Sequence, residues 1–267
     1  MNKIEVNELK KIQIKILNIF VEFCKENEMD YFLCGGTLIG AVRHQGYIPW
    51  DDDIDVALLR ADYDKFIKKF NGYNDLFKVH TSDNTSDYPY PFAKISFVKT
   101  IIKEFIDEDL KIGVNIDIFP VDILPDKKVD QLKLLNSIRR YRNKLSLKLI
   151  RINKNRSFFK NTILLIGKLI YKFEKSSYLS SSINKIAKGY INTNTNSMGV
   201  IVWGYGECEV VSNNIFSEVI PMQFEGEYYN VPIGYHEWLT SIYGEYMKLP
   251  PKEKQISHHA FEAFWIK

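Results

Sequence analysis

The sequence predicts an α+β (or α/β) protein whose mixed sheet carries a basic helical insert. Short apolar runs typical of strands alternate with amphipathic stretches typical of helices. One long segment, residues 127–192, interrupts this alternation with helical patterning. With 267 residues, 45% of them hydrophobic, the chain can bury a full core.

The N-terminal part, residues 1–126, holds most of the expected elements and is predicted to be the catalytic core. Its predicted elements are a helix over 7–26, a strand over 31–34, a helix from 37 to about 43, a strand over 53–58, a helix over 62–70, and strands over 77–80, 92–97, 101–106 and 114–119. Residues 83–91 read as a loop, and Pro120 and Pro125 are expected to close this part.

The rest of the chain divides into the insert, 127–192, and a C-terminal segment, 193–267, that completes the core and the acceptor site. We expect flexible edges on the insert at Ser176–Ser182 and at 192–196. The C-terminal segment predicts a strand over 199–203, a turn at 204–206 and a helix over 236–243.

Charge is unevenly distributed along the chain. Residues 127–188 hold 17 Lys and Arg against two acids, a net charge of +15, so the remainder carries −12. A basic insert on an acidic body suggests an anionic partner, such as a membrane surface or a polyanionic substrate. The alternative is a solvated basic helical face. No nucleic-acid recognition motif accompanies the basic residues, so no nucleic-acid partner is expected.

Two absences indicate a cytoplasmic protein. The N-terminus lacks the apolar run of a secretory signal, and the longest apolar run, 163–166, is far shorter than the roughly 20 residues that span a bilayer. The three cysteines show no CxxC spacing, which disfavours a disulfide framework or a structural zinc site. Cys34 is expected to be a buried apolar residue rather than a nucleophile.

An acidic run, Asp51–Asp55, leads into the predicted strand over 53–58. Residues two apart on a strand share a face, so Asp53 and Asp55 should point into one cleft and Asp52 away from it. Two adjacent carboxylates repel each other, and a divalent cation is the natural way to stabilise both as anions. Asp51 would join them if the strand began early.

Two more strands contribute charged residues. Asp117 alternates with Ile116 and Ile118, and an acid on such an apolar strand needs a partner. A metal shared with Asp53 and Asp55 would provide one. Lys94, a cation on an apolar strand, is expected to meet the acidic cleft or a phosphate.

A glycine pair, Gly35-Gly36, precedes Thr37 at the expected start of a helix. Backbone N–H groups at a helix start can bind phosphate, and glycine allows close approach. A plain strand-to-helix turn is the alternative. Arg43 and His44 end that helix and could reach a phosphate or a sugar, or Arg43 could simply complement the helix dipole.

These motifs together resemble a known family. The segment GGTLIGAVRHQGYIPWDDDIDVAL, at 35–58, closely resembles the signature of the LicD family, bacterial phosphocholine transferases related to fukutin and the fukutin-related protein. The segments GVNIDIFPVD (113–122), YGEYM (243–247) and LPP (249–251) resemble its later blocks. The resemblance covers nearly the whole chain, and the basic stretch matches the part of the family that varies most.

The resemblance implies a nucleotidyltransferase-like fold with Asp53, Asp55 and Asp117 as catalytic residues and ligands of Mg²⁺ or Mn²⁺. It leaves open whether Asp51 joins them, because the gap from Gly36 to Asp53 is longer than in most nucleotidyltransferases. It also implies a CDP-alcohol donor, CDP-choline in the best-known members, whose phospho-group passes to a sugar hydroxyl of a cell-surface glycan while CMP leaves.

The acceptor glycan would be teichoic acid, capsule or lipopolysaccharide. A lipid-linked acceptor would place the basic 127–188 region at the inner face of the cell membrane. Asp117 is the candidate base for the acceptor hydroxyl. Choline would need an aromatic cage; Trp50 lies near the site in sequence and is as well explained by packing. One of His258 and His259 would serve the site.

Two other functions stay open. The first is nucleotidyl transfer, which adds an NMP to a sugar phosphate, protein or RNA and releases pyrophosphate. The second is an inactive scaffold for glycan assembly, against which the intact acids argue.

Overall fold

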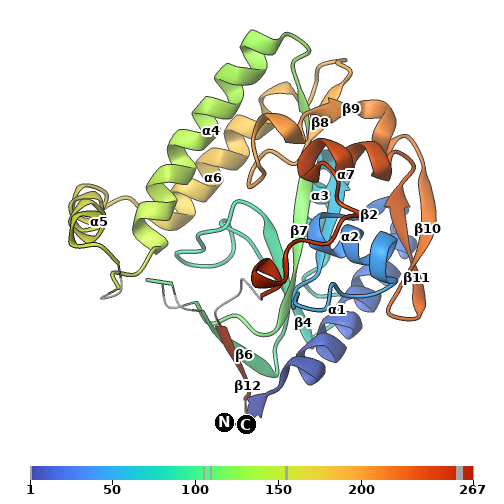
Figure 1. Cartoon of the computed structure of the whole chain (residues 1–267), viewed down its shortest axis with the longest axis horizontal. Coiled ribbons are helices and arrows are strands. Elements are labelled where there is room, and N and C mark those ends of the chain that lie inside the picture. The colour runs from blue at the N-terminus through green and yellow to red at the C-terminus, as the bar shows by residue number, and fades with distance from the viewer. Residues whose placement is uncertain (1, 105, 109, 154–155, 257–260, 267) are drawn as a thin grey trace.

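The computed structural model describes residues 2–104, 106–108, 110–153, 156–256 and 261–266 (Figure 1). Its α-helices are α1 (Val6–Glu26), α2 (Gly35–His44), α3 (Arg60–Lys69), α4 (Lys128–Leu149), α5 (Phe158–Ile170), α6 (Ser176–Ala187) and α7 (Tyr235–Tyr243). Its strands are β1 (Lys3–Ile4), β2 (Tyr31–Leu33), β3 (Asp55–Leu59), β4 (Phe77–His80), β5 (Ala93–Phe97), β6 (Thr100–Glu104), β7 (Asn115–Leu124), β8 (Ser197–Gly199), β9 (Val211–Ser212), β10 (Val219–Phe224), β11 (Glu227–Pro232) and β12 (Phe261–Trp265). The predicted α+β class is confirmed.

The central sheet is mixed and has the order β2-β3-β7-β5-β4, with β8 and β9 added beyond β7. Strand β3 runs parallel to β7, and the other pairs along this path are antiparallel. The helix α1 packs against this sheet through a stripe of buried apolar residues at three- and four-residue steps, among them Leu9, Ile16 and Phe20. A separate sheet of order β1-β12-β6 joins the two ends of the chain (Figure 1).

The strand β7 is longer than predicted, because it continues through Pro120 to Leu124. The neighbouring β5 pairs with β7 only up to Ile118. Proline cannot donate a ladder hydrogen bond, but no β5 partner lies opposite position 120, so the strand tolerates it. The added residues of β7 pair with β8 and carry Asp122 into the interior.

The insert packs firmly on the body. Helices α4 and α6 lie side by side (Figure 1). Their apolar faces form a second core with residues from both other parts of the chain, including Phe92, Leu124 and Val202. Ser176–Ser182 lies inside α6, so the predicted flexible edge there is wrong. At the start of this helix the buried Ser176 hydroxyl donates to Glu108 Oε1 at 2.6 Å.

A buried ion pair ties the sheet to the insert. The guanidinium of Arg60, at the start of α3, donates from Nε and Nη2 to Asp122 at 2.7 and 2.9 Å. Its Nη1 donates to Asn184 of α6 at 3.1 Å. Both charged side chains are almost completely buried, so each depends on the other for its charge.

The remaining differences are in the C-terminal segment. The strand predicted over 199–203 is instead β8, and the antiparallel hairpin β10-β11 and the strand β12 were not predicted. Within the described ranges, no helix combines the length and the apolar character needed to cross a bilayer.

Candidate active site

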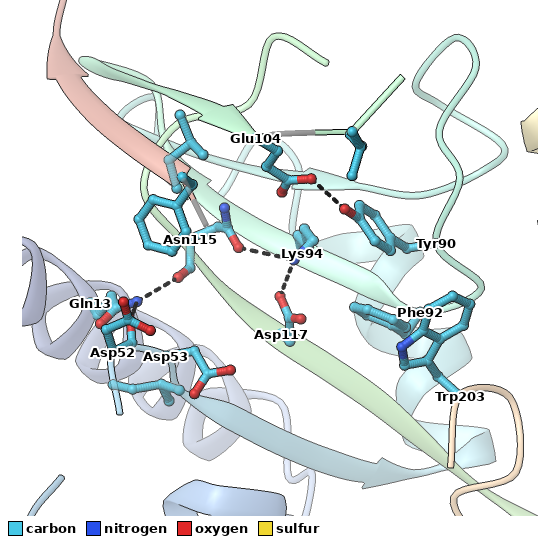
Figure 2. A pocket seen from close by; sticks show the side chains of 14 residues that line it. Gln13, Asp52, Asp53, Tyr90, Phe92, Lys94, Glu104, Asn115, Asp117 and Trp203 are labelled. Atoms are coloured by element: carbon cyan, nitrogen blue, oxygen red, sulfur yellow. Dashed lines mark hydrogen bonds and ion pairs between the residues drawn. The ribbon is translucent and has the colours of Figure 1, made fainter. Parts of the chain in front are cut away.

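A row of charged side chains crosses the centre of the sheet. Asp55 of β3 lies opposite Asp117 of β7, and Asp117 lies opposite Lys94 of β5. Residues paired in this way have Cβ atoms roughly 4.5–5.5 Å apart and share one face of the sheet. Lys94 Nζ donates to Asp117 Oδ1 at 2.6 Å and to Asn115 Oδ1 at 3.3 Å (Figure 2). Lys94 is only 7% exposed, and the Asp117 side chain is 17% exposed, so the ion pair is largely but not fully buried.

Asp53 lies outside strand β3, so the strand alternation that was predicted to place it beside Asp55 does not apply. Strand β3 begins at Asp55, so Asp53 precedes the strand and strand alternation does not orient it. Asp53 nevertheless lines the same cavities as Asp117. Asp52 also lines one of these cavities. Because no strand includes this position, the alternation that predicted Asp52 to point away does not apply.

Several acidic side chains surround Asp55. Its pKa is raised well above the usual range, first by burial and then by repulsion from Asp53, Asp117 and Asp51, while Lys94 opposes the rise. Burial alone would lower the pKa of Lys94, but its acidic neighbours, Asp117 first, outweigh burial and raise it. Lys94 therefore does not offset the combined effect of burial and of the three neighbouring aspartates on Asp55.

The glycine pair makes room for two of these carboxylates. Gly35 has φ +54°, and a Cβ there would lie 2.7 Å from Asp55 Oδ2. A Cβ at Gly36 would lie 2.6 Å from Asp51 Oδ2. Both acids therefore sit at the start of α2, where the helix dipole favours negative charge.

Thr37 holds the start of strand β3 in place. Its buried hydroxyl accepts the Asp55 N–H at 2.8 Å, and Asp55 O accepts the Cys34 N–H at 3.1 Å. Thr37, predicted to bind substrate, thus contacts the backbone of Asp55. Cys34 is buried as expected, and burial raises the pKa of its thiol, which keeps it protonated.

Two cavities meet at the carboxylates. The first chamber has a volume of about 380 Å³ and is lined by Lys94, Asp117, Asp53 and aromatic residues (Figure 2). The second chamber, about 390 Å³, is lined by Asp55, Gly35 and residues of α4, α7 and the loop after β8. Asp53, Asp117, Phe92 and Trp203 line both chambers.

The first chamber combines its acids with a buried cation. Lys94 Nζ lies 4.7 Å from the ring centroid of Tyr90 and 5.4 Å from that of Phe92. The Tyr90 hydroxyl donates to Glu104 of β6 (Figure 2).

The second chamber contains two charged residues that sequence reasoning missed. Glu209 is buried, and burial raises its pKa to about 7 against the opposing effects of the Tyr205 N–H and Arg142. The Arg142 guanidinium lies 5.1 Å from the Trp203 ring centroid and donates to Gly204 O at 2.6 Å. Only the fold brings these residues together, because α4 and the loop after β8 are far apart in sequence.

Five of the seven predicted substrate-binding residues lie elsewhere. The described residues that line the two chambers do not include Gly36, Thr37, Arg43, His44 or Trp50. Arg43 donates to Tyr246 O and to His44 Nε2, and the His44 and Trp50 rings meet edge to face. Their roles in substrate binding remain predictions. His258 and His259 lie outside the described residues.

The acids are close enough to interact electrostatically but do not form a ready-made metal cage. Across the residues that the structure describes, no group of three or more His, Cys, Asp or Glu side chains is arranged to hold a metal ion. The donor chemistry nevertheless fits a hard divalent cation, since carboxylate oxygens are its preferred ligands and a cation would offset the repulsion from neighbouring acids that raises the pKa of Asp55.

Comparisons with known proteins agree with this geometry. A family model described as LicD/FKTN/FKRP, nucleotidyltransferase domain, matches residues 28–126, which include the glycine pair and the carboxylate row. The chain is 32% identical to lipopolysaccharide cholinephosphotransferase LicD of Haemophilus influenzae over 99% of each chain. Shorter matches link it to two uncharacterized proteins. One, of Rickettsia typhi, is 35% identical over 23% of this chain and 20% of that protein, and the other, of Rickettsia prowazekii, is 49% identical over 15% of each.

Proposed function

Because the chain belongs to the LicD family and is a phosphotransferase, we propose that it transfers phosphocholine, or another phospho-alcohol, from a CDP-linked donor to a sugar hydroxyl of a cell-surface glycan. The observation that carries the proposal is the row Asp55–Asp117–Lys94 at the meeting point of two chambers. Two chambers that share catalytic carboxylates suit a reaction between two substrates. The name of the Haemophilus relative favours lipopolysaccharide as the acceptor.

We further propose that the reaction depends on Mg²⁺ or Mn²⁺ held by Asp53, Asp55 and Asp117, with Asp51 as a fourth candidate. The mutual repulsion of these acids supports this assignment, because a cation would offset it. When bound, the ion would neutralise charge on the pyrophosphate of the donor.

The residues of the chain supply positioning and proton transfer. Lys94 faces the first chamber and binds phosphate oxygens of the donor, while its ion pair with Asp117 holds that carboxylate in position. The acceptor oxygen bonds to the phosphorus of phosphocholine as the bond from that phosphorus to the CMP oxygen breaks. Asp117 accepts the hydroxyl proton, and CMP leaves with the bonding electrons.

The second chamber supplies the chemistry that a choline group needs. Trp203, Trp238 and Tyr243 offer aromatic surface, and Glu209 offers a carboxylate. A bound quaternary ammonium would favour the ionised form of Glu209, whose pKa of about 7 leaves it poised between its two states. The variant Glu209→Gln should therefore raise KM for CDP-choline more than KM for an uncharged CDP-alcohol.

Nucleotidyl transfer is the second candidate, and the nucleotidyltransferase description of the family model favours it. Products distinguish the two reactions. The protein is incubated with Mg²⁺, lipopolysaccharide and a panel of CDP-alcohols and NTPs. Release of CMP that requires the acceptor supports phosphocholine transfer, whereas pyrophosphate from an NTP supports the second reaction.

Two variants complete this experiment. Asp55→Asn should abolish CMP release, and Asp75→Asn, at an exposed position outside both chambers, should leave it unchanged. A folded wild-type protein that forms neither product with any donor would point to a scaffold instead and would refute the proposal.

A further inference from the structure

Helix α5 exposes most of its large apolar side chains, the reverse of an ordinary surface helix. Only Leu164 and Gly167 of this helix are buried. Its large apolar side chains, and Phe173 just beyond its end, are instead between 49% and 91% exposed: Phe158, Phe159, Ile163, Leu165, Ile166, Leu169, Ile170 and Phe173. A helix on a soluble surface normally buries its apolar face and exposes its polar one.

The exposed residues form one continuous face. At 100° per residue, the outward side chains of α5 fall within an arc of roughly 160°, centred near the direction of Thr162. The opposite side carries Leu164, Gly167 and Lys168. A contiguous apolar surface of this kind marks a site of interaction.

Specific contacts hold the helix in this orientation. A Cβ at Gly167 would lie 3.1 Å from both methyl carbons of Leu147, so α5 packs closely on α4 at this point. Lys168 Nζ points inward, donating to Asp107 Oδ2 at 2.6 Å and to Lys148 O. The polar side is thus anchored to the protein while the apolar side faces outward.

The charge around α5 and the length of this helix indicate which partner covers its apolar face. Exposed cations flank it, including Lys160, Lys172 and Lys175, within a region whose net charge is +15. A second copy of the chain would bring two such regions together and repel, whereas an anionic surface attracts them. The 13 residues of α5 extend about 20 Å, less than the roughly 30 Å hydrocarbon core, so the helix can lie in a membrane interface but not cross it.

We propose that α5 is an amphipathic membrane anchor that inserts its outward face into the interface of a bilayer containing anionic lipid. Figure 1 shows α5 at the outer edge of the molecule, beyond the end of α4, where a flat surface can reach it. The apolar side chains enter the boundary between headgroups and acyl chains, and the flanking lysines contact anionic headgroups. Basic charge alone predicted a membrane contact; the structure adds the insertion element.

The test is co-sedimentation with vesicles of phosphatidylethanolamine and phosphatidylglycerol. The wild type should sediment with them, and the double variant Ile166→Glu/Leu169→Glu should lose about tenfold or more in partitioning. The control Val129→Glu/Tyr228→Glu adds the same charge at comparably exposed apolar positions outside α5 and should bind much more like the wild type. Circular dichroism should be unchanged in both variants, since none of the four positions is buried.

Three outcomes would overturn the proposal. The first is a wild type that does not sediment with these vesicles, and the second is equal loss of binding in the two double variants. The third is a wild-type dimer that becomes monomeric in the α5 variant without any change in vesicle binding, because the face would then join copies of the chain. The α5 positions lie outside both chambers, so CMP release with a soluble acceptor reports separately on phosphotransfer.

Discussion

Replacing Gly35 by alanine tests whether the glycine pair makes room for the carboxylates of Asp55 and Asp51 that we propose take part in catalysis. The new Cβ would lie 2.7 Å from Asp55 Oδ2, whereas ordinary contact begins at 3.4 Å, so the carboxylate must retreat by about 0.7 Å. The backbone of Asp55 cannot easily follow, because Thr37 and Cys34 hold it by hydrogen bonds. The shift therefore falls on the carboxylate itself.

Two effects of different size follow from Gly35→Ala. The positive φ of +54° should cost about 1–2 kcal/mol of unfolding free energy in a residue with a Cβ. Activity should suffer more, since misplacing a reacting group by about 1 Å can cost roughly 100-fold. We expect kcat/KM for CMP release to fall by about 10- to 100-fold at a temperature where the variant is fully folded.

The matched control is Gly226→Ala in the β10-β11 turn. Gly226 also has a positive φ, +87°, but a Cβ there would meet nothing within 4 Å. This variant should lose similar stability and keep its activity. Urea denaturation and initial rates of CMP release measure the two quantities. If folded Gly35→Ala keeps its rate within about threefold of the wild type, the glycine does not seat Asp55 and the reasoning fails.

Three further predictions concern other parts of the site and its support. Gly36→Ala should reduce the rate of CMP release only if Asp51 takes part in the reaction, because the new Cβ would displace Asp51 Oδ2 alone. Asp51→Asn should then give a similar loss of activity. A loss in only one of the two variants would show that Gly36 does not act through Asp51. Asp122→Asn should destabilise the protein by up to about 3–5 kcal/mol in urea, because the buried Arg60 guanidinium keeps only the more distant carboxylate of Asp64, 3.6 Å from Nη1. The double variant Arg60→Met/Asp122→Leu should recover much of this loss, and a single variant as stable as the wild type would contradict the argument. The folded-state pKa of Glu209 is about 7, whereas the ordinary value is 4.5, so ionisation of Glu209 destabilises the fold increasingly as the pH rises from 4.5 to 7. Glu209→Gln should therefore be more stable than the wild type by about 3 kcal/mol at pH 8 and by under about 1 kcal/mol at pH 5. A difference in stability that is the same at both pH values would refute this prediction.

The elements of the N-terminal part could be predicted from the sequence because their signals are local. The helix over 7–26 and the strand over 77–80 follow from spacing and composition within a short window, and the structure matches them closely. The β10-β11 hairpin was missed because it lacks such a signal: its strands carry no clear alternation, and five of the six residues of β10 are only partly buried or exposed. The extension of β7 through Pro120 depends on where a neighbouring strand ends, which no local pattern encodes.

The residues of the site divide in the same way, into those that local sequence patterns predict and those that only the fold brings together. Charged residues on apolar strands predicted that Asp55 and Asp117 belong together and that Lys94 meets the acidic cleft or a phosphate. Strand order and register add that Lys94 lies opposite Asp117. Glu209 and Arg142 could not be predicted, because each is unremarkable in its own segment and they meet only when α4 packs beside the loop after β8. For α5 the sequence contains the apolar arc, but not which side of the helix faces the protein.

The uneven charge of the chain acquires a physical role in this arrangement. The proposed catalytic acids lie in the part of the chain that carries −12, and an anionic donor would be repelled from them. The insert supplies the opposite field, and Arg142 extends it to the wall of the second chamber. The Arg60–Asp122 pair and its contact with Asn184 fix the insert to the same strand that carries Asp117. On the proposed function, the basic region thus both draws the donor towards the carboxylates and, through α5, holds the site near a lipid-linked acceptor.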